Sequence, residues 1–412
     1  MNLGLAELPT RCDVLVVGAG PAGSAAAQWL ARAGREVLLV DQHAFPRDKV
    51  CGDGLIADAL RALDRLGVRD EVLAEARRSA TLGCIGPRGG RIDVPGSLAV
   101  LPRRRLDEIV CRAAIAAGAR MFAPARFVAP LSEGGRVVGA ELEHDGESRR
   151  VRADWLVLAT GAQPQAMLAA GLCERRAPSG IALRGYIRNP AMTPRIASLE
   201  VVWHARLAPG YGWIFPCGDD VFNIGVGVAD DGASGHRAGS PHLNLREAFA
   251  AFQSIYAKAA ELVQGGEWQG PPGAALKGAP LRCSLEGARL DAPGVLACGE
   301  AAGSTYALTG EGIGKAMETA LHAAEAILAH GADEAAVRAD YRARIASLKP
   351  RFDLYAQAHR AVSHPWLVDL LVWSARRSPR RLERLAGVLE ETYLPKDGMS
   401  LRGILRRVFD LR

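Results

Sequence analysis

The chain has 412 residues, of which 49% are hydrophobic, so it can bury a large core and form two or three domains. No run of 18 uninterrupted apolar residues occurs, and the N-terminus lacks a signal-peptide pattern, so we expect a cytoplasmic protein. The net charge is +6 and the pI is near 9.0, yet no recognition motif accompanies the basic residues, so we expect no nucleic-acid partner. Eight scattered cysteines without a C-x-x-C pair argue against a disulfide framework and against a metal site.

The first predicted elements surround a glycine-rich turn. An apolar run at 13–17 predicts a buried parallel strand, and the alanine-rich run at 22–33 predicts a helix. Gly18, Gly20 and Gly23 match G-x-G-x-x-G. The first glycine permits the tight turn, the second lets the backbone approach a pyrophosphate, and the third lets the helix pack closely on the strand. We therefore expect the turn to bind a dinucleotide through Gly18, Ala19, Gly20, Pro21, Ala22 and Gly23.

The next predicted strand has an acidic residue at its end. Residues 36–40 predict the strand, and Asp41 follows it. An acid at this distance from the glycine turn is placed to bind the ribose hydroxyls of an adenosine. Strand, turn, helix, strand and acid therefore follow in the order of a Rossmann βαβ unit.

A second glycine-rich segment lies about 280 residues after the first. Residues 295–298 predict an apolar strand, Gly299 and Glu300 follow it, and a T-G-E-G-I run then leads into a helix. A helix N-terminus at Gly312 and Ile313 would stabilise an anionic reduced flavin ring, and Glu300 could accept hydrogen bonds from ribityl hydroxyls. The two segments together predict one FAD bound by both ends of the chain.

The pattern between and after these segments predicts further domains. Alternating strands dominate from about 180 to 285, where we expect an antiparallel sheet that forms a wall for substrate. We predict an α/β protein with a Rossmann-like FAD-binding domain, an interleaved α+β substrate domain with an antiparallel sheet, and a helical C-terminus. The expected segments are 1–80, 81–175 with interleaved strands and 286–330 for the FAD-binding domain, 176–285 for the substrate domain and 331–412 for the helical region.

Four elements together resemble the geranylgeranyl reductase family, within the flavoproteins built like para-hydroxybenzoate hydroxylase and the flavin-dependent halogenases. They are the first glycine turn, the run K-V-C-G-D-G at 49–54, the run P-G-Y-G-W-I-F-P at 209–216, and the second glycine segment at 299–313. The third of these is similar to the family's Y-x-W-x-F-P signature. The resemblance spans roughly residues 10–330.

The resemblance implies roles for four residues. Tyr211 and Trp213 would line the substrate cavity near the flavin, Cys51 would lie near flavin or substrate, and Arg103 would contact the cofactor ahead of its helix. The alternative for the two aromatic residues is a place in the core of a strand. The alternative for Cys51 is an ordinary loop position without a nucleophilic role.

The chain departs from the family pattern at several positions. Asp53 stands where many members have a glycine, Glu300 replaces the usual aspartate, and Ala307 replaces a common proline. The halogenase signature W-x-W-x-I-P is absent because Tyr211 occupies its first position. Halogenation is therefore not expected.

Two enzyme classes remain open. The first hypothesis is a reductase that hydrogenates carbon–carbon double bonds of a prenyl or isoprenoid substrate by hydride transfer from reduced flavin. The alternative is a monooxygenase that hydroxylates an aromatic or natural-product-like substrate through a flavin C4a-hydroperoxide. The same scaffold hosts both, so the fold cannot decide between them. A non-enzymatic flavin-binding protein is disfavoured by cofactor motifs at both ends of the chain.

The expected partners follow from this chemistry. No second G-x-G-x-x-G follows a strand, so NADPH or NADH would bind transiently, or a reduced electron-carrier protein would supply electrons. The substrate is expected to be a small molecule or lipid-like. The basic segment at 401–409 and the apolar C-terminal helices would suit peripheral contact with the inner face of a membrane.

Overall fold

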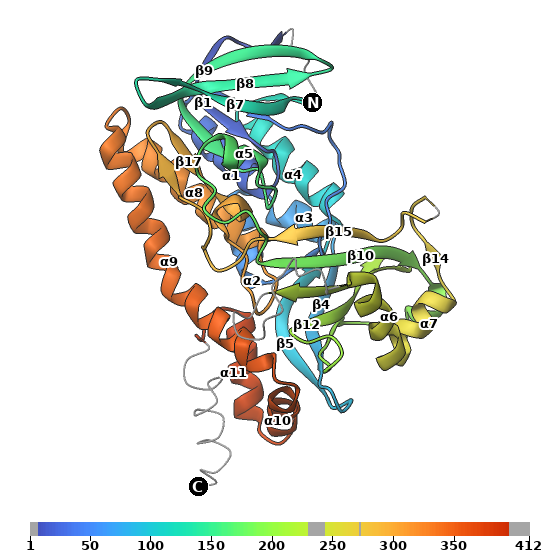
Figure 1. The fold of residues 1–412 in the computed structure, drawn as a ribbon. Coiled ribbons are helices and arrows are strands. Elements are labelled where there is room, and N and C mark those ends of the chain that lie inside the picture. The colour runs from blue at the N-terminus through green and yellow to red at the C-terminus, as the bar shows by residue number, and fades with distance from the viewer. Residues whose placement is uncertain (1–6, 230–243, 272, 395–412) are drawn as a thin grey trace.

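A computed structural model describes residues 7–229, 244–271 and 273–394. It contains two sheets, here called sheet A and sheet B, with a long C-terminal helix running past both of them (Figure 1). The mixed α/β class that the sequence predicts is confirmed.

Sheet A contains the strands of the predicted βαβ unit. Its central strands β17, β9, β1, β2 and β6 are parallel neighbours, and the β7–β8 hairpin and β16 extend it in antiparallel fashion. The apolar side chains of β1 and β2 are buried, as their sequence requires for a parallel sheet. The strands are β1 (Arg11–Val17), β2 (Val37–Val40), β6 (Arg120–Phe122), β7 (Arg126–Glu133), β8 (Arg136–His144), β9 (Glu147–Leu158), β16 (Asp291–Ala292) and β17 (Val295–Ala297).

Helices α1 (Pro21–Arg32), α4 (Arg103–Ala116) and α8 (Ile313–His330) pack against one another and against buried side chains of sheet A. The α1 face toward α8 consists largely of alanine and glycine, so the two helices approach closely. The N-termini of α1 and α8, which are 292 residues apart in the chain, thereby belong to the same core. This packing joins the two glycine-rich segments.

Sheet B has nine strands and is mostly antiparallel, with one parallel pair between β4 and β11. The antiparallel sheet predicted within 176–285 is present, and it is extended by strands from earlier in the chain. β3, β4 and β5 come from segments that we assigned to the FAD-binding domain, yet they pair within sheet B. The strands are β3 (Gly54–Leu55), β4 (Arg77–Ile85), β5 (Arg91–Val100), β10 (Gly180–Arg188), β11 (Leu199–Val202), β12 (Gly210–Gly218), β13 (Val221–Ala229), β14 (Glu267–Trp268) and β15 (Lys277–Leu281).

The two faces of sheet B differ in character. One face packs Ile214, Ile224 and Val226 against α6 (Leu245–Ile255) and α7 (Ala257–Gln264), seen at the right of Figure 1. Because side chains alternate along a strand, Tyr211 and Trp213 point to the opposite face. One face of sheet B therefore packs on α6 and α7, and the opposite face carries Tyr211 and Trp213.

The remaining helices enclose these sheets. The C-terminal region is helical, as predicted, and α10 and α11 pack on β5 through a shared apolar cluster. The segment 401–409, which we expected to be basic and membrane-facing, lies outside the described residues. No helix in the described ranges is long and apolar enough to cross a bilayer. These helices are α2 (Ala57–Arg65), α3 (Arg69–Glu75), α5 (Gln165–Ala169), α9 (Glu334–Val362), α10 (Pro365–Arg376) and α11 (Pro379–Leu389), with short 3₁₀ turns at Pro190–Met192 and Gly299–Ala302.

Candidate functional site

Two glycines of the first glycine turn lie too close to neighbouring backbone atoms to carry a side chain. Gly18 has φ +99°, and a Cβ there would lie 2.4 Å from the Ala159 carbonyl oxygen. A Cβ on Gly23 would lie 1.7 Å from the Gly18 carbonyl oxygen. These two glycines are therefore required by the turn and by the close approach of α1 to it.

Gly20 differs from its two neighbours, because the space in front of it is open. A Cβ on Gly20 would meet only the guanidinium ends of Arg47 at 3.5 Å and Arg103 at 3.8 Å. Pro21 is the first residue of α1, and no side chain caps this helix N-terminus among the described residues. Free backbone N–H groups, the positive end of the helix dipole and two guanidinium groups thus surround one space, which suits a diphosphate.

Asp41 lies at the end of β2 and faces the turn. Its Oδ2 accepts a hydrogen bond from the Ala19 backbone N–H at 2.9 Å and lies 3.5 Å from the Arg47 guanidinium. Burial acts to raise the pKa of Asp41, but the hydrogen bond with His43 and the Arg47 charge outweigh it and lower the pKa. The carboxylate is therefore ionised at neutral pH, as an acceptor for ribose hydroxyls must be.

Arg103 is the first residue of α4, and Asp107 holds its side chain. The Arg103 guanidinium donates to both Asp107 oxygens at 2.5 and 2.8 Å, and Arg47 donates to the same carboxylate at 3.0 Å. Burial disfavours the charged form of Arg103, but Asp107 outweighs it and raises the pKa above its ordinary value. Both arginines are therefore fixed cations beside the turn.

The second glycine segment is brought directly against the first. Gly299 has φ +65°, and a Cβ there would lie 2.7 Å from the Cβ of Ala22. Glu300 lies in the short 3₁₀ turn that follows, and its Oε1 accepts from the Thr305 hydroxyl at 3.4 Å. Gly312 precedes α8, and Ile313, its first residue, is buried. Unlike α1, helix α8 has a side-chain acceptor in its first turn, because Glu311 Oε1 accepts from the Gly314 backbone N–H at 2.7 Å.

One of the two signature aromatics of β12 connects sheet B to the second glycine segment. The Tyr211 hydroxyl donates to the Thr309 carbonyl oxygen at 3.0 Å, within the second glycine segment. The Trp213 indole lies across the glycines of β13, where a Cβ on Gly225 would be 2.3 Å from the ring. Tyr211 and Trp213 lie on the sheet face away from α6 and α7, and the Trp213 side chain is only 5% exposed.

Comparison with known proteins agrees with this arrangement. A family model described as "FAD binding domain" matches residues 11–212. The menaquinone reductase of Mycolicibacterium smegmatis is 35% identical over 336 residues, 78% of each chain. The digeranylgeranylglycerophospholipid reductase 1 of Methanopyrus kandleri is 31% identical over 320 residues, which cover 74% of this chain and 77% of the relative. The chain belongs to the geranylgeranyl reductase family of FAD-dependent oxidoreductases.

Two solved structures superpose on nearly the whole length of this chain. A geranylgeranyl bacteriochlorophyll reductase-like protein from Thermoplasma acidophilum superposes with a TM-score of 0.73 at 22% identity, covering 97% of this chain and 96% of that one. A flavin-dependent brominase superposes with a TM-score of 0.71 at 19% identity, over 97% and 98% of the two chains. These similarities concern the fold, which reductases and halogenases share.

The residues of this family member fit FAD on independent structural grounds. Two hydroxyl groups in the cofactor segments, Thr160 Oγ1 and Ser304 Oγ, are buried and have no hydrogen-bond partner within the described ranges. Buried polar groups are normally satisfied, so each of these atoms can accept or donate to a polar ligand. Together with the open space at Gly20, they fit a ligand that carries phosphates at one end and hydrogen-bonding groups along its length.

Sequence reasoning missed a buried hydrogen-bond network behind the cofactor segments, which we call the Asp53 network. It consists of Asp53, Tyr186, Asn223 and Trp213. The Trp213 Nε1–H donates to Asn223 Oδ1 at 2.9 Å, and Asn223 Nδ2 donates to Asp53 Oδ2 and to the Cys51 carbonyl oxygen, both at 2.8 Å. The Tyr186 hydroxyl also donates to Asp53 Oδ2. The sequence feature that could have indicated this network is the aspartate of the C-G-D-G run.

Cys51 lies beside this network, and its thiol is a weak nucleophile. Burial raises the pKa of Cys51, although the Arg103 charge acts to lower it. The thiol receives a hydrogen bond from the Asp53 backbone N–H at 3.4 Å. The structure therefore brings Cys51 to the predicted site but keeps it as a protonated thiol.

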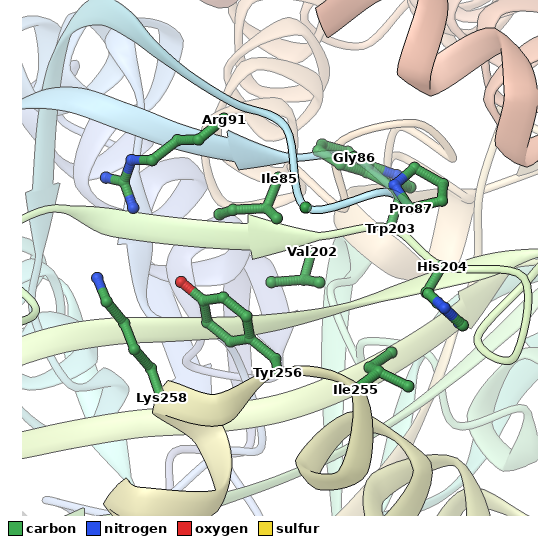
Figure 2. A pocket seen from close by; sticks show the side chains of 11 residues that line it. Ile85, Gly86, Pro87, Arg91, Val202, Trp203, His204, Ile255, Tyr256 and Lys258 are labelled. Carbon is green, nitrogen blue, oxygen red and sulfur yellow. The ribbon is translucent and has the colours of Figure 1, made fainter.

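A separate pocket of about 240 Å³ lies on the other side of sheet B (Figure 2). Three of its polar side chains already have a partner. Buried Glu200 accepts from Arg91 at 2.6 Å, Lys258 at 2.7 Å and Tyr256 at 2.6 Å. His204, which also lines the pocket, accepts from the Arg206 backbone N–H, in keeping with a structural role. None of the residues predicted to bind cofactor lines this pocket.

Proposed function

We propose that this protein reduces carbon–carbon double bonds in a prenyl or isoprenoid substrate. The observation that carries the proposal is the bond between the Tyr211 hydroxyl and the Thr309 carbonyl, which ties the family's substrate signature to the flavin segment. The relatives named above are reductases of isoprenoid lipids, which supports the same substrate class for this chain.

The site geometry supports a separate role for the cofactor and for each group of residues. FAD, when bound and reduced, supplies a hydride. The glycine turn, Arg47 and Arg103 would hold its phosphates, and Asp41 and Glu300 would accept hydrogen bonds from its hydroxyls. Tyr211 and Trp213 would orient the alkene and exclude water. As the electron source we propose NADPH or NADH bound transiently, or a reduced carrier protein.

A lipid-like substrate would be met at a membrane surface, and α10 offers a face that suits one. Among the described residues, the exposed large hydrophobic side chains are Trp366, Trp373 and Tyr393. Trp366 and Trp373 lie seven residues apart on α10, so they share one helix face, and the Arg377 guanidinium stacks on Trp373 at 4.4 Å. Tryptophan beside arginine is typical of protein surfaces that meet anionic lipid headgroups. We therefore propose peripheral contact with the inner face of a membrane.

Anaerobic turnover tests the function. The FAD-loaded protein is incubated with NADPH or NADH, and separately with dithionite, in the presence of a prenylated naphthoquinone or a geranylgeranyl glycerolipid. A product that gains two hydrogens per prenyl double bond, without oxygen, supports the reductase. A product that gains one oxygen atom, and only in air, would instead support the monooxygenase. The Gly20→Val protein, which we expect to lack FAD, serves as the control.

A further inference from the structure

Asp53 is a fully buried acid that the cofactor-binding roles above do not use. Its backbone has φ +64°, in the left-handed region that favours glycine. Aspartate tolerates this conformation better than most residues do. A glycine would therefore satisfy the backbone here, and the aspartate adds a carboxyl group to the interior of the site.

Four segments of the chain meet at this carboxyl group. Its Oδ1 accepts from the backbone N–H of Arg103 at 3.3 Å, and its Oδ2 accepts from Asn223 and from Tyr186. The neighbouring guanidinium groups are engaged elsewhere, since Arg103 binds Asp107 and Arg184 binds Asp48 at 2.6 Å. In the part of the chain that the structure describes, neither guanidinium forms an ion pair with Asp53.

Tyr186 links this buried acid to the substrate face of sheet B. In the strand register Tyr186 lies opposite Asn223, and Asn223 lies opposite Phe215. Directly paired residues project to the same face, so Tyr186 shares the face that carries Tyr211 and Trp213. Tyr186 is half-buried whereas Asp53 has no exposed surface. The phenol therefore joins the buried acid to the sheet face that carries Tyr211 and Trp213.

We propose that Tyr186 and Asp53 deliver the proton that alkene reduction requires in addition to the hydride; this rests on the reductase function proposed above. Bound and reduced FAD would supply the hydride for one new C–H bond. The π electron pair forms the other with the Tyr186 proton, as the Tyr186 O–H bond breaks. The proton of protonated Asp53 moves to the Tyr186 oxygen, and water then reprotonates Asp53. Tyr186 is the catalytic residue, and Asp53 is the positioning residue that acts through it.

Burial and the Asp53 charge raise the pKa of Tyr186, so the phenol keeps its proton at neutral pH and releases it only as the proton from Asp53 replaces it. Burial raises the pKa of Asp53 to about 6, although the Tyr186 hydrogen bond, the Arg184 charge and the Asn223 hydrogen bond act to lower it. The titratable and charged groups that face Asp53 are Cys51 in its own loop, Arg103 in α4, Arg184 and Tyr186 in β10, and Cys217 in β12. Because the protonated form is the donor, the rate of alkene reduction should fall as the pH rises through about 6.

Single-turnover kinetics test the pair. Reduced FAD-loaded protein is mixed anaerobically with a geranylgeranyl glycerolipid, which has no quinone ring to oxidise the flavin, and flavin reoxidation is followed from pH 5 to 8, the range around the Asp53 pKa. Tyr186→Phe should slow this step by about 100-fold or more, while FAD binding and reduction by dithionite stay unchanged. Asp53→Asn should remove the fall in rate near pH 6. The matched control is Tyr256→Phe, which removes a similar tyrosine–carboxylate bond on the opposite face and should keep the wild-type rate.

A second readout needs neither substrate nor flavin. Infrared difference spectra of the FAD-free protein should show protonated carboxylic acid that titrates near pH 6. The Asp53 contribution to this band should be missing in Asp53→Asn, while the contribution of buried Asp58 remains. A Tyr186→Phe rate within about threefold of wild type, with an unchanged pH profile, overturns proton delivery by Tyr186 and Asp53 while leaving the reductase function intact. An infrared band that is the same in wild type and Asp53→Asn overturns the role of Asp53. A wild-type protein that cannot reduce the alkene contradicts both proposals, and that result is distinct from the other two.

Discussion

Gly20→Val separates the contribution of the glycine turn to folding from its contribution to cofactor binding. Gly20 has φ −72° and ψ −173°, which any residue adopts, and its added Cβ would make only ordinary contacts with two flexible side-chain ends. We therefore expect the unfolding free energy of the FAD-free protein to change by less than about 1 kcal/mol. The added side chain would fill the space in front of the α1 N-terminus, so FAD affinity should fall at least about 100-fold, or about 2.8 kcal/mol.

The assay is FAD titration of the apoprotein by flavin fluorescence, together with urea unfolding of both apoproteins. Gly23→Ala is the contrasting variant, because its Cβ would lie 1.7 Å from the Gly18 carbonyl oxygen and the turn itself must move. It should lose stability as well as FAD. A Gly20→Val protein that binds FAD within about threefold of wild type would refute the assignment of this space to the cofactor phosphates.

Further predictions concern the buried charges and the surface. Asp107→Ala would leave the buried Arg103 guanidinium without its carboxylate and the partly buried Arg47 with Asp41 alone, so urea unfolding should show a loss of about 3–5 kcal/mol. For Asp53, the folded pKa of about 6 exceeds the ordinary 3.8, so the folded state holds a proton that the unfolded state has lost. Wild-type stability should therefore fall relative to Asp53→Asn as the pH rises from about 4 to 7, by up to about 3 kcal/mol, and a constant difference would contradict the buried acid. Replacing Trp366 and Trp373 together by alanine should weaken flotation with vesicles that contain phosphatidylglycerol and leave FAD binding intact; equal flotation would exclude this face of α10.

The opening βαβ unit was predictable because its signals are local. The strand predicted at 36–40 is observed as Val37–Val40, and the helix predicted at 22–33 is observed as Pro21–Arg32. Each depends on hydrophobic period and glycine placement within a short stretch of chain. The second glycine segment was also found in sequence, although its contact with the first could be inferred only from their shared ligand.

The Asp53 network was not predictable, because it joins distant residues. Asp53 is 133 residues from Tyr186 and 170 from Asn223, and nothing in the periodicity of β10 or β13 marks their polar side chains as partners. Arg47 was missed for a similar reason, since a loop arginine gains its role only when α4 places Asp107 beside it. The pairing of β4 with β11 likewise joins residues that are more than 100 positions apart, and strand patterns alone do not specify such partners.

The most direct test of the reductase account is the fate of reduced flavin when oxygen is absent. The FAD-loaded protein is reduced with dithionite, freed of excess reductant and mixed with a prenylated naphthoquinone in a stopped-flow instrument, and the products are then analysed by mass spectrometry. The account predicts that flavin is reoxidised at a rate that depends on substrate concentration, with one prenyl double bond saturated for each flavin. Flavin that stays reduced until oxygen is admitted, followed by an oxygenated product, would contradict it.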